Sequence, residues 1–349
     1  MKKNINEMMN KTVELLNIPS PSGYTFAAID FVDNFFKSLG IKTKKTIKGA
    51  LIATIPGEDN SNAYTLSAHV DTLGAMVKEI KSDGRIKLTQ VGGYTWNSVE
   101  GENCIVHASN NNTYNGTILL HQASVHVYSS KASETKRSED NMEIRLDEVV
   151  KNSEDVEKLG ICVGDFVSFD SRTQYLESGY LKSRHLDDKA CVGILMAVAN
   201  HIVSEKISLP HDLNFFISNY EEVGHGASSG IPENTVEFIA VDMAAPGDGQ
   251  TSDEQKVTIC AKDSSGPYDY ILKEKMVSLA KENKLDYSID IYPSYGSDAS
   301  AAMRSGANVR HGLIGPGVDS SHAYERTHVD AMKASVDLCV ALVQQEIKK

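Results

Sequence analysis

Histidines and acidic residues stand in this sequence at the points where apolar runs stop. The full set is His69, Asp71, Asp187, Glu221, Glu222, Asp242 and His322. Each one alone has an ordinary explanation, such as a helix cap at Asp187 or a solvated turn at Glu221 and Glu222. Separate caps and turns do not explain why so many of these residues stand at the ends of apolar runs. In open α/β sheets, ligands bind in the crevice at the carboxyl ends of the strands, and we expect these side chains to meet there.

The residue types indicate a metal centre. Imidazoles and carboxylates without thiolates form a site that suits Zn²⁺, Co²⁺ or Mn²⁺. Two histidines with three or four carboxylates are too many ligands for one tetrahedral ion. They are about right for two ions that share a ligand at a separation of roughly 3.5–4 Å.

An α/β domain must position these residues. Hydrophobic periodicity predicts helices over 4–17 and 24–39, and a buried apolar helix over 187–203. The strands "ALIATI", "AYTLSAHV", "LNFFISNY", "EFIAVDMA" and "KVTICAK" are followed or separated by helices near 267–283, 297–305 and 328–347. This alternation predicts a mixed central sheet with helices on both faces.

The sequence pattern in the middle of the chain predicts an inserted domain. Between residues 75 and 180 the sequence consists of short β-like pieces, "SVHVY" (124–128) among them, separated by Gly, Asn and Ser turns. The charged, Ser-rich stretch 129–141 is expected to be a mobile, solvated loop. We therefore predict an α/β domain made of 1–73 and 181–349, interrupted by a β-rich domain at 74–180.

Composition excludes several classes of protein. The net charge of -12 and the pI of about 5.4 argue against a nucleic-acid binder, which usually has a basic surface. The five scattered cysteines contain no CxxC pair and are expected to be reduced thiols. The N-terminal residues lack the apolar region of a secretion signal, and no apolar run approaches the roughly 18 residues of a membrane span. A cytoplasmic location is expected.

The order His-x-Asp, Asp-Asp, Glu-Glu, Asp and His resembles that of co-catalytic zinc peptidases. The stretches "SAHVDTLGAMV", "LDDKACVG" and "EEVGHGAS" look most like those of the M42 aminopeptidase family, the TET-type aminopeptidases, over essentially the whole chain. In that family the insert also lies between the His-x-Asp strand and the Asp-Asp turn, and the resemblance implies that 74–180 is a PDZ- or barrel-like domain and that 1–73 and 181–349 form the catalytic domain. The chain departs from the common M42 pattern at Val70–Thr72, at His225–Gly226 and in "KACVG", so substrate preference does not transfer with the resemblance.

The resemblance implies a role for each residue of the set. His69 and His322 would each bind one metal ion, Asp187 would bridge the two, and Glu222 and Asp242 would complete the ligands. Asp71 would hold the other ring nitrogen of His69, and Glu221 would be the general base that takes the proton of a metal-bridging water. The implied enzyme is a dinuclear metallo-aminopeptidase acting on short peptides. It would carry two divalent ions per subunit, with zinc the first candidate and cobalt or manganese as alternatives. The insert would mediate assembly into dimers and a tetrahedral dodecamer.

Four alternatives stay open. "GASSG" at 226–230 fits the nucleophile pattern G-x-S-x-G, with Ser228 as nucleophile. Adjacent carboxylates could belong to a glycosidase, and a non-catalytic assembly protein could use the same fold. A metal-dependent deacylase of N-acyl amino acids shares the chemistry. Arg304, Arg310 and His311 could bind an acidic first residue, and the preferred residue, the metal and the oligomeric state are not fixed by the sequence.

Overall fold

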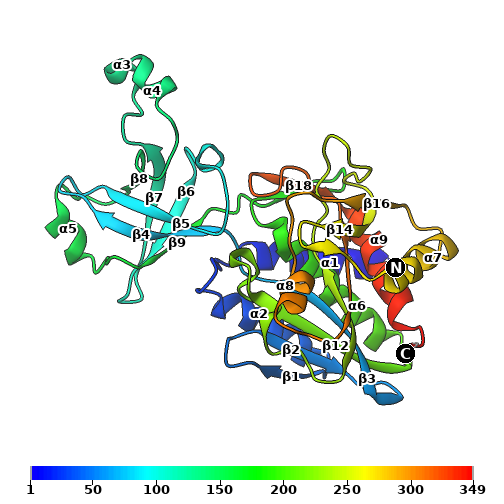
Figure 1. The fold of residues 1–349 in the computed structure, drawn as a ribbon. Helices are drawn as coiled ribbons and strands as arrows, with labels where there is room; N and C mark the ends of the chain where they lie inside the picture. The colour runs from blue at the N-terminus through cyan, green and yellow to red at the C-terminus, as the bar shows by residue number, and fades with distance from the viewer. Residues whose placement is uncertain (1, 348–349) are drawn as a thin grey trace.

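A nine-stranded mixed sheet forms the centre of the larger part of the molecule (Figure 1). The computed structural model describes residues 2–347, with side chains from residue 5 onward. In spatial order the strands are β1 (Lys42–Lys45), β2 (Leu51–Ile55), β12 (His211–Ser218), β3 (Asp59–His69), β13 (Thr235–Val241), β17 (Arg310–Pro316), β14 (Val257–Asp263) and β15 (Gly266–Pro267), and β16 (Tyr287–Ile291) pairs with β14. Strands β12, β3, β13 and β17 are parallel, so their carboxyl ends lie at one edge of the sheet.

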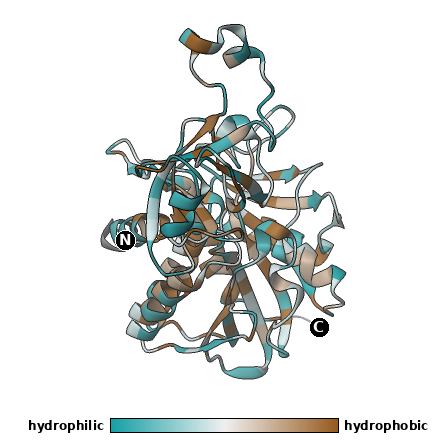
Figure 2. Ribbon diagram, turned by 90° about the vertical axis from the view of Figure 1, so that its left-hand side faces the viewer, coloured by the Kyte–Doolittle hydropathy of each residue, from teal (hydrophilic) through white to brown (hydrophobic). Residues whose placement is uncertain are grey.

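Helices cover both faces of this sheet, as predicted. One face packs against α1 (Lys2–Leu16), α2 (Phe26–Ser38), α6 (Leu186–Ser204), α7 (Tyr270–Glu282) and α9 (Val329–Val343), and the other against α8 (Asp298–Arg304). Successive strand residues alternate between the two cores, because their side chains point to opposite sides. Phe215 of β12 belongs to the first core and Phe216 to the second. Figure 2 shows the apolar residues gathered along these strands and helices.

Helix α6 is buried along nearly its whole length between the sheet, α1 and α9. This burial explains why its residues are apolar on all sides. Gly193 allows α1 to pack closely, because a Cβ there would lie 2.0 Å from Oγ1 of Thr12. Despite this apolar character, none of the helices between residues 2 and 347 is long and apolar enough to cross a membrane.

The insert forms a closed antiparallel barrel beside the large sheet (Figure 1). Around the barrel the strands are β4 (Gly74–Ile80), β5 (Ile86–Val91), β8 (Met142–Leu146), β7 (Thr113–Leu120), β6 (Asn103–His107) and β9 (Phe166–Phe169). The barrel has its own apolar core, and the helix α5 (Ser153–Lys158) and the 3₁₀ turn η1 (Trp96–Ser98) lie in its connections. A small sheet of β10 (Gln174–Tyr175), β11 (Tyr180–Ser183) and β18 (Glu325–His328) joins the barrel's exit to the C-terminal part of the chain.

The secondary structure predicted for the segment between β7 and β8 was wrong. Residues 124–128 were expected to be a strand but form the short helix α3 (Val125–Tyr128), followed by α4 (Ser130–Glu134) within the predicted loop. This segment projects away from the barrel (Figure 1), where no neighbouring strand can satisfy its backbone. The N–H of Tyr128 bonds locally to the carbonyl of Ser124 at 2.9 Å, and the side chain of Val127 stays 72% exposed.

Candidate metal centre

Four of the predicted site residues lie at or after the ends of three adjacent parallel strands. His69 is the last residue of β3, Asp242 directly follows β13, and Glu221 and Glu222 lie in the turn η2 (Glu221–Val223) after β12. Asp187 precedes the regular part of α6, where the Asp187–Asp188 peptide bond is cis. The structure thus brings these side chains to one edge of the sheet, where His322 joins them from the loop before β18.

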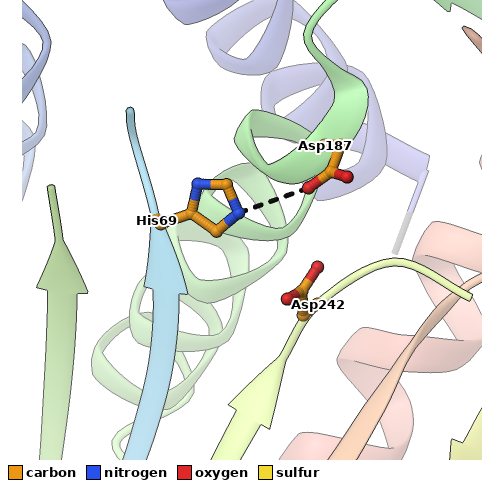
Figure 3. Close-up of side chains that lie close together, drawn as sticks. All are labelled: His69, Asp187 and Asp242. Carbon is orange, nitrogen blue, oxygen red and sulfur yellow. Dashed lines mark ion pairs between the residues drawn. The ribbon is translucent and has the colours of Figure 1, made fainter. Parts of the chain in front are cut away.

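His69, Asp187 and Asp242 form the first group of possible metal ligands. Their side chains point toward one another from β3, the start of α6 and the end of β13 (Figure 3), and one ligand atom from each lies within 4.8 Å of the others. Nε2 of His69 is 3.2 Å from Oδ1 of Asp187. All three residues are buried.

Asp187 also belongs to a second group, with Glu222 and His322. Nε2 of His322 lies 3.4 Å from Oδ2 of Asp187 and 3.6 Å from Oε2 of Glu222. The two oxygens of one carboxylate therefore face two different histidines. Such an arrangement fits a carboxylate shared by two ions.

The ring of His69 is oriented for binding through Nε2. Its Nδ1 lies 2.9 Å from the carbonyl oxygen of Asp71 and 3.5 Å from the carboxylate of Asp71. A neutral imidazole has one N–H, so donation through Nδ1 leaves a lone pair on Nε2. That buried Nε2 has no hydrogen-bond partner, and neither has Oε1 of Glu222. Unpartnered buried ligand atoms beside carboxylates fit a divalent metal ion.

The carboxylate of Asp71 has a second role that the sequence did not indicate. It accepts the backbone N–H groups of Glu221 at 3.1 Å and Glu222 at 3.2 Å, and the hydroxyl of Ser22. Asp71 is fully buried. It therefore fixes the turn that carries both glutamates.

The electrostatics of the cluster favour cations. Burial, and then the neighbouring Asp187, raise the pKa of Asp242 to about 7. Burial is also the largest cause that raises the pKa of Glu221 and Glu222. For His69 burial lowers the pKa, but the neighbouring carboxylates of Asp187 and Asp71 outweigh it and the pKa is raised. Each of these shifts reflects an excess of buried negative charge, which bound cations would offset.

The barrel contributes to the second group. Nδ1–H of His322 donates to the carbonyl of Gly93, in the connection between β5 and β6, and the hydroxyl of Ser98 donates to the carbonyl of His322 at 3.4 Å. Arg184 binds the carbonyl of Ser98 and, at 3.3 Å, that of Ala323. His322 is thus held between the barrel and the large domain.

An open hollow of about 490 Å³ lies over the cluster. Its walls comprise Asp187, Glu221, Glu222, Gly224, Asp242, Met243, Ala245, Ser294, Tyr295, Gly296, Ser297, Arg304, Ser321 and His322. Arg304 is the one lysine or arginine among these residues in the described part of the chain. The hollow can admit a small polar substrate end, which Glu221 and the possible metal ligands would contact.

Two predicted substrate residues, Arg310 and His311, are not brought to this hollow. They begin β17, where Arg310 pairs in register with Glu237 near the start of β13, at the opposite edge of the sheet from Asp242. The guanidinium of Arg310 lies 3.4 Å from the buried carboxylate of Glu237, and the ring of His311 packs against Tyr268. Strand direction could not be predicted at this point, so the proximity of these two residues to Arg304 in the chain was misleading.

Ser228 does not have the surroundings of a nucleophile. Its hydroxyl donates to the carbonyl of His225 at 2.8 Å and lies 3.3 Å from Nζ of Lys48. The hydroxyl proton thus goes to a backbone carbonyl, and Nζ of Lys48 also donates to that carbonyl and to the carbonyl of Gly226, so neither partner acts as the base that an activated serine requires. The turn around it, η3 (Gly226–Ser228), instead packs on α8, where Asp298 accepts the N–H of Ala227 at 2.8 Å.

The fold and the site together define a class of proteins: α/β peptidases whose sheet edge carries a cluster of histidines and carboxylates and whose chain is interrupted by a barrel. Within it, this chain belongs to the M42 peptidase family, because the model of that family, described as M42 glutamyl aminopeptidase, matches residues 49–338. The chain is therefore a peptidase, and hence a hydrolase.

Relatives and solved structures agree with this assignment. The chain is 52% identical to the putative aminopeptidase YhfE of Bacillus subtilis, over 97% of this chain and 98% of that protein. It is 23% identical to a lysyl aminopeptidase of Pyrococcus furiosus, over 62% and 60% of the two chains. A TET aminopeptidase from a marine sediment archaeon of the Thaumarchaeota has the same fold, with a TM-score of 0.89 at 17% identity over 97% of both chains. The TET1 peptidase of Pyrococcus horikoshii, described as assembling into a tetrahedron or a large octahedral shell, has a TM-score of 0.86 at 22% identity over 97% of this chain and 100% of that chain.

Proposed function

We propose that this protein is a metal-dependent aminopeptidase that removes N-terminal residues from short peptides with two divalent ions per subunit. The observation that carries the proposal is the position of Asp187. Its two carboxylate oxygens face two separate ligand groups, one with His69 and Asp242 and one with Glu222 and His322.

In this proposal each group of three residues holds one ion, and Asp187 is common to both. Ions held there would lower the pKa of a bound water toward neutrality and polarise the carbonyl of the scissile peptide bond. The donor set of imidazoles and carboxylates accepts zinc, cobalt or manganese. Zinc remains the first candidate.

Glu221 is proposed as the general base. Among the described residues it belongs to neither ligand group, yet its Oε2 lies 3.7 Å from Nε2 of His69 and its side chain lines the hollow. Burial raises its pKa above the ordinary value for a glutamate, so it can accept a proton from the attacking water and release it again. The proton would pass to the nitrogen of the leaving amine as the peptide bond breaks.

The hollow also suits a free N-terminus. The carboxylates of Glu221, Glu222 and Asp242 border it, and a positively charged α-amine would be attracted to them. Arg304 on the same wall would favour an acidic side chain on the first residue. The family description names a glutamyl aminopeptidase, whereas a relative is named a lysyl aminopeptidase. These names differ in the preferred first residue, so the proposed preference for an acidic residue rests on Arg304 alone.

Self-association is proposed by analogy with structures of the same fold. One of them, of PhTET1, is described as a dodecamer, with a TM-score of 0.84 at 23% identity over 97% of this chain and 99% of that chain. The inserted domain at 74–180 is the proposed assembly element, and size-exclusion chromatography with light scattering tests it. The cytoplasmic location stays a prediction of the sequence.

The test of the function compares free-amine and N-acetylated substrates. Protein stripped with chelator is reloaded with Zn²⁺, Co²⁺ or Mn²⁺ and assayed on aminoacyl-p-nitroanilides and their N-acetyl counterparts. We expect metal-restored cleavage of the free-amine series only. In Glu221→Gln we expect kcat to fall about 10²- to 10⁴-fold, because the base is lost, with metal content unchanged. Cleavage of acylated substrates alone would instead support a deacylase, and activity that survives stripping would contradict the metal centre.

A further inference from the structure

Glu325 connects the two residues on which the second ligand group depends. It is the first residue of β18 and its side chain is fully buried. Its Oε2 accepts the backbone N–H of Asp187 and its Oε1 accepts the backbone N–H of His322, both at 3.1 Å. One carboxylate thus joins two segments that are far apart in the sequence.

The loop that carries His322 needs such a contact. His322 has φ +64° and Ser320 has φ +61°, a left-handed conformation that residues other than glycine seldom adopt. Local backbone preference therefore does not place the imidazole, and tertiary contacts must do so. The ring is fixed by the carbonyl of Gly93 and the backbone by Glu325.

The geometry requires both oxygens of the carboxylate. A glutamine at this position could accept one of the two N–H groups, but its amide nitrogen would face the other as a second donor. A residue that only caps a helix needs one side-chain oxygen to accept an N–H at the start of that helix. Here the second oxygen holds a loop that comes from another part of the chain.

We propose that Glu325 is a positioning residue of the second metal site. It holds Asp187 and His322 through their backbones so that Oδ2 of Asp187 and Nε2 of His322 converge with Glu222. This inference rests on the proposed two-metal site. It adds a residue that would touch neither a metal ion nor the substrate.

The test is calorimetric titration of chelator-stripped protein with Zn²⁺, together with the metal content of each variant by elemental analysis. The wild type should bind two ions. Glu325→Gln should weaken the binding of the ion held with Glu222 and His322 about 10- to 100-fold, as is typical when a group that orients a ligand is lost. The ion held with His69 and Asp242 should be weakened less, because its site shares only Asp187 with the second group. Activity should return at high Zn²⁺ concentration, because no ligand has been removed.

Asp290 offers a matched control. It is also a buried carboxylate that accepts two backbone N–H groups, those of Thr251 and Ser252, both at 2.8 Å. Asp290→Asn should lower the melting temperature and leave both Zn²⁺ affinities unchanged. If Glu325→Gln does not fold by circular dichroism, Glu325→Asp, which keeps both oxygens on a shorter side chain, takes its place.

The outcomes separate the two proposals. A wild type that binds two ions, with Glu325→Gln or Glu325→Asp binding both as tightly, overturns the role of Glu325 and leaves the proposed function standing. Equal weakening of Zn²⁺ binding by the Asp290 variant would also overturn it, because the effect would then be a general loss of stability. A wild type that binds fewer than two ions overturns the two-metal function and this inference with it.

Discussion

Removal of the metal ions should make the stability of the folded protein fall as the pH rises from 5 to 8. Asp242 is 5% exposed, and burial and the neighbouring Asp187 raise its pKa from 3.8 to about 7. A carboxyl group whose folded pKa lies above its unfolded value stabilises the protein fully below the unfolded pKa. That contribution is lost as the pH rises through the folded pKa.

The magnitude follows from this shift. About three pKa units at about 1.4 kcal/mol each give roughly 4 kcal/mol between acid and neutral pH, of which about 3 kcal/mol falls between pH 5 and pH 8. Glu221 and Glu222 are shifted in the same direction. His322, with a pKa raised to about 9, also loses its stabilising contribution as the pH rises, so these contributions share one sign.

Ordinary surface carboxylates do not interfere in this interval. Those with a lowered pKa, such as Asp59 and Asp83, contribute stability above their unfolded pKa near 4, and the contribution is already complete at pH 5. It is lost only as the pH falls further. Buried His185 and Lys189, with pKa values lowered to about 3 and about 7, act in the opposite direction, because they stabilise the protein increasingly as the pH rises. The contribution of Asp242 is therefore isolated by comparing the wild type with a variant that lacks this carboxyl group.

The assay is urea unfolding of chelator-stripped protein at pH 5, 6.5 and 8, followed by circular dichroism. Asp242→Asn is the control, because it removes the titrating group and should reduce the pH dependence by about 3 kcal/mol. Protein loaded with Zn²⁺ should not lose stability over this range, since metal binding requires deprotonated ligands and strengthens as the pH rises. Metal-free protein that is as stable at pH 8 as at pH 5 would refute the reasoning.

Further substitutions test the surroundings of the site. Gly226→Ala should destabilise the protein by about 1–3 kcal/mol, because its Cβ would lie 2.1 Å from Oδ1 of Asp298. Thermal unfolding measures this loss. The control Gly247→Ala should change the stability little, because a Cβ there meets no atom within 4 Å. Arg304→Ala should raise KM for substrates with an acidic first residue about fivefold, in line with the value of a partly exposed ion pair, and leave other substrates unaffected. Arg310→Ala should leave KM unchanged but lower stability by about 1 kcal/mol or more, because it removes one cation from a buried carboxylate. Equal effects of the two arginine variants on KM would contradict the placement of Arg310 away from the hollow.

Much of the fold and of the site could be predicted because local patterns match the structure. The alternation of strands and helices predicted the mixed sheet, and polar residues after apolar strands predicted which side chains would meet. His69 and Asp242 end adjacent parallel strands, so strand order alone brings them together. A β-rich insert was also expected, since its short strands carry clear turn signals.

The residues that hold the site could not be predicted in the same way. Glu325 looks like an ordinary polar residue three positions after His322, and its role depends on contact with Asp187, which lies 138 positions away in the chain. Arg310 was misplaced because the sequence does not reveal which end of a strand faces the site. Residues 124–128 were misassigned because their composition suits a strand, but no neighbouring strand lies beside them.

The carbonyl of Gly93 gives the barrel a thermodynamic connection to the proposed metal centre. It accepts the Nδ1–H of His322, so the orientation of this proposed metal-binding imidazole depends on how the barrel sits against the large domain. Linkage is reciprocal. A partner molecule that fixes the barrel in this orientation would tighten metal binding by a certain factor, and metal binding would strengthen that partner's hold on the barrel by the same factor. For a protein proposed to assemble through its barrel, metal content and assembly would then be measured as one coupled equilibrium.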